Sequence, residues 1–128
     1  MKRFKDADRL QHILDAISKI ESFLMLSDLK KFLASEKDQS AVCMQMTIIG
    51  EAAGKLSPDL YAQYPEIPWH QVISMRNVLV HDYIDVNYSK VWDTTQSDLP
   101  VLKAKITGIL AELQPQNKPE KSLKHPKI

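Results

Sequence analysis

Apolar residues recur at steps of three and four along most of this chain, and this spacing restricts the possible folds more than any other feature. Near the start the pattern covers residues 3 to 26, which predicts one long amphipathic helix. The apolar face of that helix consists of Leu10, Ile13, Leu14, Ile17, Ile20 and Leu24. No strand-like alternation of any length occurs. The sequence therefore predicts an all-α protein.

Two serines mark the starts of short helices. Ser27 is expected to cap a short turn of helix over residues 29 to 33. Ser57 is followed by Pro58, so the serine is the expected cap of the next short helix and the proline lies in its first turn.

A second long helix begins between these two short ones. Ser35 is its expected cap in a sequence like a capping box, with Asp38 where Glu is usual. The small residues between positions 50 and 54 allow another helix to approach closely. Its apolar face consists of Val42, Cys43, Met46, Ile49, Gly50, Ala53 and Leu56.

Prolines and an asparagine organise the next part of the chain. Residues 64 to 68 form a rigid connector, because each proline there pushes the residue before it out of the helical region. Pro68 is the expected first residue of a helix over roughly residues 68 to 82. Asn87 is the expected cap of a further helix.

Pro100 divides the last helical pattern. A proline inside a helix costs about 3 kcal/mol, so a kink or restart is expected there, with Ser97 or Asp98 as the new cap.

Residues 114 to 128 are rich in lysine and proline, which predicts a disordered basic tail. The prediction is one helical domain over residues 1 to 113, an up-and-down bundle of four or five helices.

Composition limits the classes of function. A chain of 128 residues with 44% hydrophobic residues can bury a core as one soluble domain. Its formal charge is +1, so any contact with RNA must come from a local patch.

The single cysteine, Cys43, lies in an apolar helical pattern and is expected in the core of a protein in a reducing compartment. No apolar run is long enough for a membrane span, and the start of the chain does not resemble a signal peptide, so a cytoplasmic location is expected.

Arg76, His81 and Tyr83 stand close together in an otherwise apolar stretch. Burying such groups without partners costs several kcal/mol, so their presence needs a reason. Arginine binds two phosphate oxygens at once, and histidine exchanges a proton near neutral pH. In an α-helix, Arg76, Asn77 and His81 would share an arc of less than half the circumference. An arginine that binds the phosphate and a histidine that moves a proton are together the smallest set of side chains that can cleave RNA without a metal ion.

Other interpretations of the same residues remain open. Arg76 and His81 would also suit a buried network that ties helices together through a carboxylate such as that of Glu51. A metal site from His81, Asp82 and Asp85 has a spacing that matches no well-formed ligand set, so no metal is expected. His12 and His70 are expected on the surface, and the tyrosines and tryptophans outside the motif are expected to be packing aromatics.

Four blocks of sequence lie between residues 50 and 100: Gly50-Glu51-Ala52-Ala53-Gly54-Lys55-Leu56-Ser57, Pro65-Glu66-Ile67-Pro68-Trp69, Met75-Arg76-Asn77-Val78-Leu79-Val80-His81-Asp82-Tyr83, and Val91-Trp92-Asp93-Thr94 followed by Asp98-Leu99-Pro100. Together these blocks resemble the HepT-like proteins of the HEPN superfamily. Ser74 departs from the family pattern, which commonly has glycine before Met-Arg-Asn, and the tail after Leu113 is not shared. The resemblance covers about residues 3 to 113.

The resemblance implies the toxin of a toxin–antitoxin pair, acting as a metal-independent endoribonuclease without a cofactor. The family's catalytic positions fall on Arg76, Asn77 and His81. Its modified tyrosine falls on Tyr83, to which a partner nucleotidyltransferase attaches AMP from ATP and so silences the toxin. Family members form homodimers in which the two motif helices meet. The resemblance leaves open whether a higher hetero-oligomer forms with the antitoxin.

These expectations define a mechanism and two competing interpretations. His81 would accept the proton of the attacking 2′-hydroxyl, Arg76 would bind the phosphate, and a second copy of the chain would supply the acid, leaving a 2′,3′-cyclic phosphate. The first alternative is a non-catalytic helical module that docks a nucleotidyltransferase and binds nucleotide. The second is a structural helical protein whose motif is a buried network. The near-neutral charge gives no preference between transfer RNA and messenger RNA as the substrate.

Overall fold

The computed structural model describes residues 2–77 and 86–113, and for residues 2–4 the backbone alone. Over these residues all regular structure is helical, which confirms the all-α prediction. A 3₁₀ turn, η1 (Met75–Asn77), follows α5, and a π-helical turn, η2 (Thr94–Asp98), joins α6 to α7. The α-helices are α1 (Lys2–Phe23), α2 (Leu29–Leu33), α3 (Glu36–Ala53), α4 (Pro58–Gln63), α5 (Trp69–Ser74), α6 (Tyr88–Asp93) and α7 (Leu99–Leu113).

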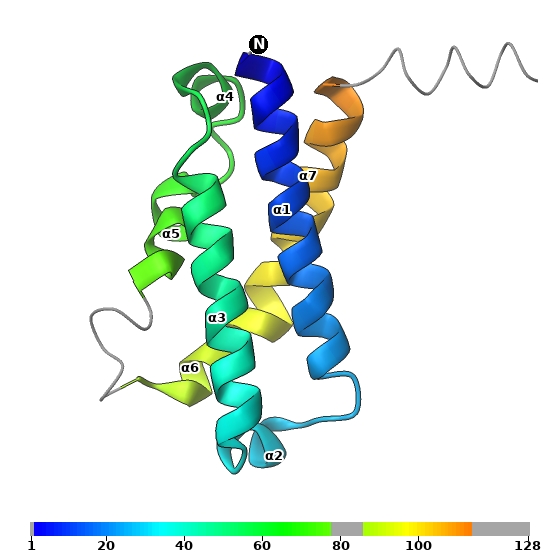
Figure 1. Cartoon of the computed structure of the whole chain (residues 1–128), viewed down its shortest axis with the longest axis vertical. Coiled ribbons are helices and arrows are strands. Elements are labelled where there is room, and N and C mark those ends of the chain that lie inside the picture. Colours follow the sequence, from blue (N-terminus) through cyan, green and yellow to red (C-terminus); the bar gives the residue numbers. More distant parts are fainter. Residues whose placement is uncertain (1, 78–85, 114–128) are drawn as a thin grey trace, which may run out of the picture.

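Three long helices form the body of the bundle, with α1 packed against both α3 and α7. The chain runs down along α1, up along α3, down through α5 and up again along α7, as the colours of Figure 1 show. This up-and-down order confirms the predicted bundle. The predicted apolar faces are the ones that are buried, and the side chains with the least exposure include Leu10, Ile13, Ile17, Ile20, Phe32, Val42, Cys43, Ile49 and Ile106.

Helix caps agree with the sequence at three positions, and the cap of the second helix differs. The hydroxyl of Ser35 accepts a hydrogen bond from Asp38 N at 3.1 Å, and Ser57 and Asn87 cap α4 and α6 in the same way. The prediction that Ser27 caps the second helix is wrong. Asp28 does so, because its carboxylate accepts from Lys31 N at 2.8 Å, three residues on.

The helix that carries the motif begins one residue later than predicted and changes type before the motif. Pro68 is the capping residue, α5 runs over Trp69–Ser74, and Met75 to Asn77 then form the tighter 3₁₀ turn. The remainder of the predicted helix, residues 78 to 82, lies outside the described residues. The α-helical spacing assumed for the motif therefore fails at its first two residues, since a 3₁₀ turn advances by about 120° per residue.

The prediction of a restart at Pro100 is correct, but its predicted cap is wrong. Neither Ser97 nor Asp98 caps α7, because both lie within the π-helical turn and the backbone stays helical through Leu99. A π turn leaves room where a proline lacks its N–H and would meet the carbonyl four residues earlier. The chain thus passes Pro100 by a change from π-helical to α-helical hydrogen bonding.

In the part of the chain that the structure describes, none of the helices has the length and apolar character needed to cross a membrane. The predicted tail, residues 114–128, lies outside that part. The boundary after residue 113 and the homodimer with motif helices at its interface stay predictions.

Candidate active site

The motif begins at the exposed end of the α5–η1 segment. Arg76 is exposed and Asn77 is half-buried, both in the 3₁₀ turn. Val72 and Met75, on the same segment, pack in or against the core. His81 and Tyr83 lie outside the described residues, so the structure brings together only Arg76 and Asn77 of the four predicted site residues.

Gly50 of α3 permits the backbone of η1 to lie directly on that helix. An ideal Cβ at Gly50 would stand 2.2 Å from the Arg76 backbone N and 2.7 Å from the Ile73 carbonyl oxygen. No side chain fits between atoms at such distances, since carbon atoms in contact are about 3.5–4.0 Å apart. The prediction that the small residues of this helix allow a close approach is confirmed, and the segment that approaches is the one that carries Arg76.

The Arg76 side chain lies across the last turn of α3. An ideal Cβ at Gly54 would stand 3.2 Å from Nη1 of Arg76, so the guanidinium occupies the space above this glycine. Gly54 is the C-cap residue of α3, and the aligned peptide dipoles of the helix give this end partial negative charge. A cation at this end is favourable, which gives an exposed arginine a defined position.

A tyrosine and a buried carboxylate lie beside the same helix end. The hydroxyl of Tyr61 donates to the carbonyl of Ala53 at 2.7 Å. Burial raises the pKa of Tyr61, and the charge of Asp6 acts in the same direction, whereas the positive charge of Arg76 opposes both. The phenol therefore lies within electrostatic reach of the guanidinium.

Asp6 connects this region to the start of α1. Its side chain is 3% exposed and accepts hydrogen bonds from Ser57 N at 2.9 Å and from Ser57 Oγ at 2.6 Å. Sequence reasoning found Ser57 as a cap but missed Asp6 and Tyr61. No local signal marks these two residues, because their partners lie 51 and 8 positions away along the chain.

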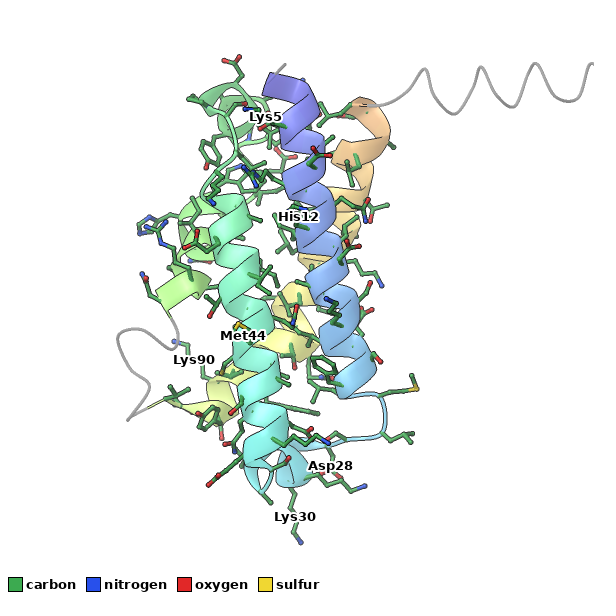
Figure 2. The ribbon with its side chains drawn as sticks, in the orientation of Figure 1. Lys5, His12, Asp28, Lys30, Met44 and Lys90 are labelled. Carbon is green, nitrogen blue, oxygen red and sulfur yellow. The ribbon has the colours of Figure 1, made fainter. Side chains whose placement is uncertain are left out.

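The other candidate residues have ordinary environments. His12 lies on the outer side of α1 (Figure 2), and His70 is also exposed. Glu51 is exposed, and no hydrogen bond or ion pair joins it to Arg76 among the described residues. Cys43 is fully buried, and burial raises the pKa of its thiol to about 11, which confirms a core role.

A metal site is not formed by the residues with described positions. Over residues 2–77 and 86–113, no three His, Cys, Asp or Glu side chains are grouped to hold an ion. His81, Asp82 and Asp85, the weak metal-ligand alternative, lie outside these ranges.

Comparison with known proteins shows which class of enzyme and which protein family this chain belongs to. The model described as Ribonuclease HepT-like matches residues 13–109, which include the whole motif. A protein of Thermococcus cleftensis named "Probable ribonuclease HepT" is 39% identical over 105 residues, which make up 82% of this chain and 94% of that protein. A protein of Methanocaldococcus jannaschii whose name describes an RNase is 31% identical over 105 residues, 82% of this chain and 90% of that protein. No solved structure matches significantly.

The helical bundle and these matches define an enzyme of the ribonuclease class. The chain belongs to the HepT-like ribonuclease family.

Proposed function

We propose that this chain is the toxin of a toxin–antitoxin pair and cleaves RNA without a metal or other cofactor. The observation that carries this proposal is the position of Arg76. Its guanidinium is exposed yet located over Gly54 at the end of α3, within a chain of the HepT-like ribonuclease family. An arginine held in this way can bind a phosphate group and keep it in one place.

The proposed reaction is a transesterification within the RNA chain. The 2′-hydroxyl oxygen attacks the adjacent phosphorus, its proton passes to His81, and the bond from phosphorus to the 5′-oxygen breaks. Arg76 binds the non-bridging oxygens, which gain negative charge in the transition state. Asn77 holds His81 in position. The products are a 2′,3′-cyclic phosphate and a free 5′-hydroxyl.

The leaving 5′-oxygen needs a proton, and one copy of the motif has only one histidine. We propose that two copies of the chain form a homodimer whose motif segments face one cleft. The partner subunit's His81, or water, then protonates the leaving oxygen.

We further propose that an antitoxin of the nucleotidyltransferase class silences the enzyme by modifying Tyr83. The phenol oxygen attacks the α-phosphorus of ATP, pyrophosphate leaves, and AMP stays on the tyrosine. The attached phosphate brings negative charge and bulk to the place where Arg76 would bind the substrate phosphate. A Tyr83→Phe variant should therefore stay toxic when the antitoxin is co-expressed. Full neutralisation of that variant would instead indicate inhibition by binding alone.

The decisive experiment is RNA cleavage by purified protein in the presence of a chelator. Arg76→Ala and His81→Ala should each lower the rate by at least about 100-fold, as expected for loss of electrostatic stabilisation or of general base catalysis. His70→Ala is the matched control, because His70 is an exposed histidine on α5. Cleavage that is lost with chelator and retained in His81→Ala would refute the mechanism. Binding of nucleotide without any cleavage would favour the non-catalytic docking module.

A further inference from the structure

A groove of about 580 Å³ lies between α5–η1 on one side and α6, η2 and α7 on the other. Such a volume falls within the range of about 300–1,000 Å³ that is usual for small-ligand sites. Its floor is apolar and includes side chains from three helices, namely Met46 of α3, Val72 of α5 and Leu102 of α7. These three floor residues are buried in the hydrophobic core.

Two lysines give the rim of the groove positive charge. Lys90 projects from α6 (Figure 2) and Lys105 from α7, and both are exposed. Among the described residues, neither ammonium group forms an ion pair, whereas Lys103 on another side of α7 is 2.9 Å from Glu21. Asp98 is the acidic residue of the lining. The charge of the lining is therefore +1, from two lysines and one aspartate.

Two lining residues of the groove stand next to the motif in the chain. Ser74 and Met75 contribute to its lining and directly precede Arg76 in the chain. Because Met75 lines the groove and Arg76 is the next residue, the groove is near enough for a strand with one phosphate at Arg76 to reach it with a neighbouring nucleotide.

We propose that the groove is a subsite for one nucleotide of the RNA substrate next to the bond that is cut, an inference that rests on the proposed function. Lys90 and Lys105 bind the phosphates on either side of this nucleotide. The base lies against the apolar floor, since any base can cover apolar surface with its flat face. The carboxylate of Asp98 accepts a hydrogen bond from an exocyclic amino group. This subsite would add affinity and register without touching the reacting atoms.

Binding is measured separately from cleavage with a labelled oligoribonucleotide whose 2′-positions are O-methylated, so that no attacking hydroxyl is present. Lys90→Ala and Lys105→Ala should each weaken binding roughly three- to tenfold and lower the slope of log K against log salt by about 0.7. Lys103→Ala is the matched control on α7, because Lys103 is paired with Glu21 and does not line the groove. With cleavable RNA, the same groove variants should raise KM and leave kcat within twofold. Equal binding by wild type and both groove variants would overturn the proposal.

Val101→Glu gives a second test that does not depend on lysine. Val101 is a lining residue with 55% exposure, so a glutamate is tolerated there and places negative charge beside the bound strand. Binding should fall at least tenfold while sedimentation shows an unchanged oligomeric state. If Val101→Glu instead separates the subunits of an oligomer, the groove is filled by a second copy of the chain and the subsite does not exist.

The two proposals fail in distinguishable ways. Full cleavage by Arg76→Ala would refute the proposed function, whatever the lysine variants do. Loss of cleavage in Arg76→Ala together with normal binding by Lys90→Ala, Lys105→Ala and Val101→Glu would refute only the subsite.

Discussion

Arg76 is positioned by glycines that lie more than twenty residues before it in the chain. Gly50 lets the backbone of η1 touch α3, and Gly54 leaves the space in which the guanidinium lies. The two glycines differ in what faces them. At Gly50 the nearest atoms are mostly backbone, which cannot move without moving the segment, whereas at Gly54 the nearest atom is the end of a flexible side chain.

A series of three glycine-to-alanine variants tests this difference. Gly50→Ala should destabilise the protein by about 3 kcal/mol or more, because a methyl group there overpacks the contact between α3 and η1. Gly54→Ala should leave the free energy of unfolding within about 1 kcal/mol of the wild type, since φ is −71° and only the guanidinium must shift. The same variant should lower RNA cleavage a few-fold. Urea denaturation and a cleavage assay give both quantities.

Gly108→Ala is the control of the series. An added Cβ there meets nothing within 4 Å, and the residue is exposed on α7. It should stabilise the helix by about 0.5–1 kcal/mol and leave cleavage unchanged. Equal stabilities of Gly50→Ala and Gly108→Ala would contradict the close approach of η1 to α3.

Cys43 shows how burial sets the chemistry of a single side chain. The thiol is inaccessible, and its pKa of about 11 compares with an ordinary value of 9.0. The unfolded state therefore loses the thiol proton at lower pH than the folded state does. The corresponding stability is fully present below about pH 9 and is lost as the pH rises toward 11.

Two measurements check this prediction. Cys43 should not react with a thiol reagent at pH 8 until denaturant is added. The fall in unfolding free energy between pH 9 and pH 11 should be smaller in Cys43→Ala than in the wild type, although this variant is less stable overall because of the cavity. Tyr61 and Tyr88, whose pKa values are also raised by burial, contribute a fall of the same sign in both proteins. Rapid thiol labelling of the native protein would contradict the burial of Cys43.

Short helices in this fold are held by contacts with other helices, because isolated helices of five or six residues are unstable in water. Phe32 of α2 lies against the rings of Tyr88 and Trp92 of α6, with ring centroids 6.3 Å and 5.6 Å apart. The start of α4 is held to α1 by the two hydrogen bonds between Ser57 and Asp6. Each short element thus depends on a residue far away in the chain.

Ser57→Ala tests the connection of α4 to α1. The variant loses the bond that Leu60 N donates to the Ser57 hydroxyl, and it leaves one oxygen of the buried Asp6 carboxylate without a partner. A lost cap costs about 0.5–2 kcal/mol and an unpaired buried polar group about 1–3 kcal/mol, so a loss of about 2–4 kcal/mol is expected. Ser40→Ala, an exposed serine in the middle of α3, is the matched control and should change stability by less than about 0.5 kcal/mol. Similar stabilities of the two variants would show that the Asp6 contact contributes little.

The proposed homodimer makes a prediction for the molecule as a whole. If one cleft needs two copies of the motif, the specific activity should fall as the protein is diluted below the dissociation constant of the dimer. Analytical ultracentrifugation and cleavage assays over the same concentration range should give the same midpoint. Constant specific activity from a protein that sediments as a monomer would rule out a shared site.

The length and order of the main helices follow from local physical chemistry and were predicted from the sequence. Apolar spacing fixes which face of α1, α3 and α7 is buried. Ser35, Ser57 and Asn87 cap helices because their side chains accept hydrogen bonds from the backbone N–H three residues on. Motif blocks also sufficed to identify the family, which the comparisons confirm. The roles of Arg76, Asn77, His81 and Tyr83 stay predictions.

The surroundings of the motif were decided by the tertiary structure. Nothing local in the sequence shows that Arg76 lies over Gly54, that Asp6 binds Ser57, or that Lys90 and Lys105 share one groove. Such contacts join residues on different helices, and they form only when the apolar faces pack. Periodicity specifies which side of each helix is buried, but the distances between helices depend on how the side chains of all of them fit together.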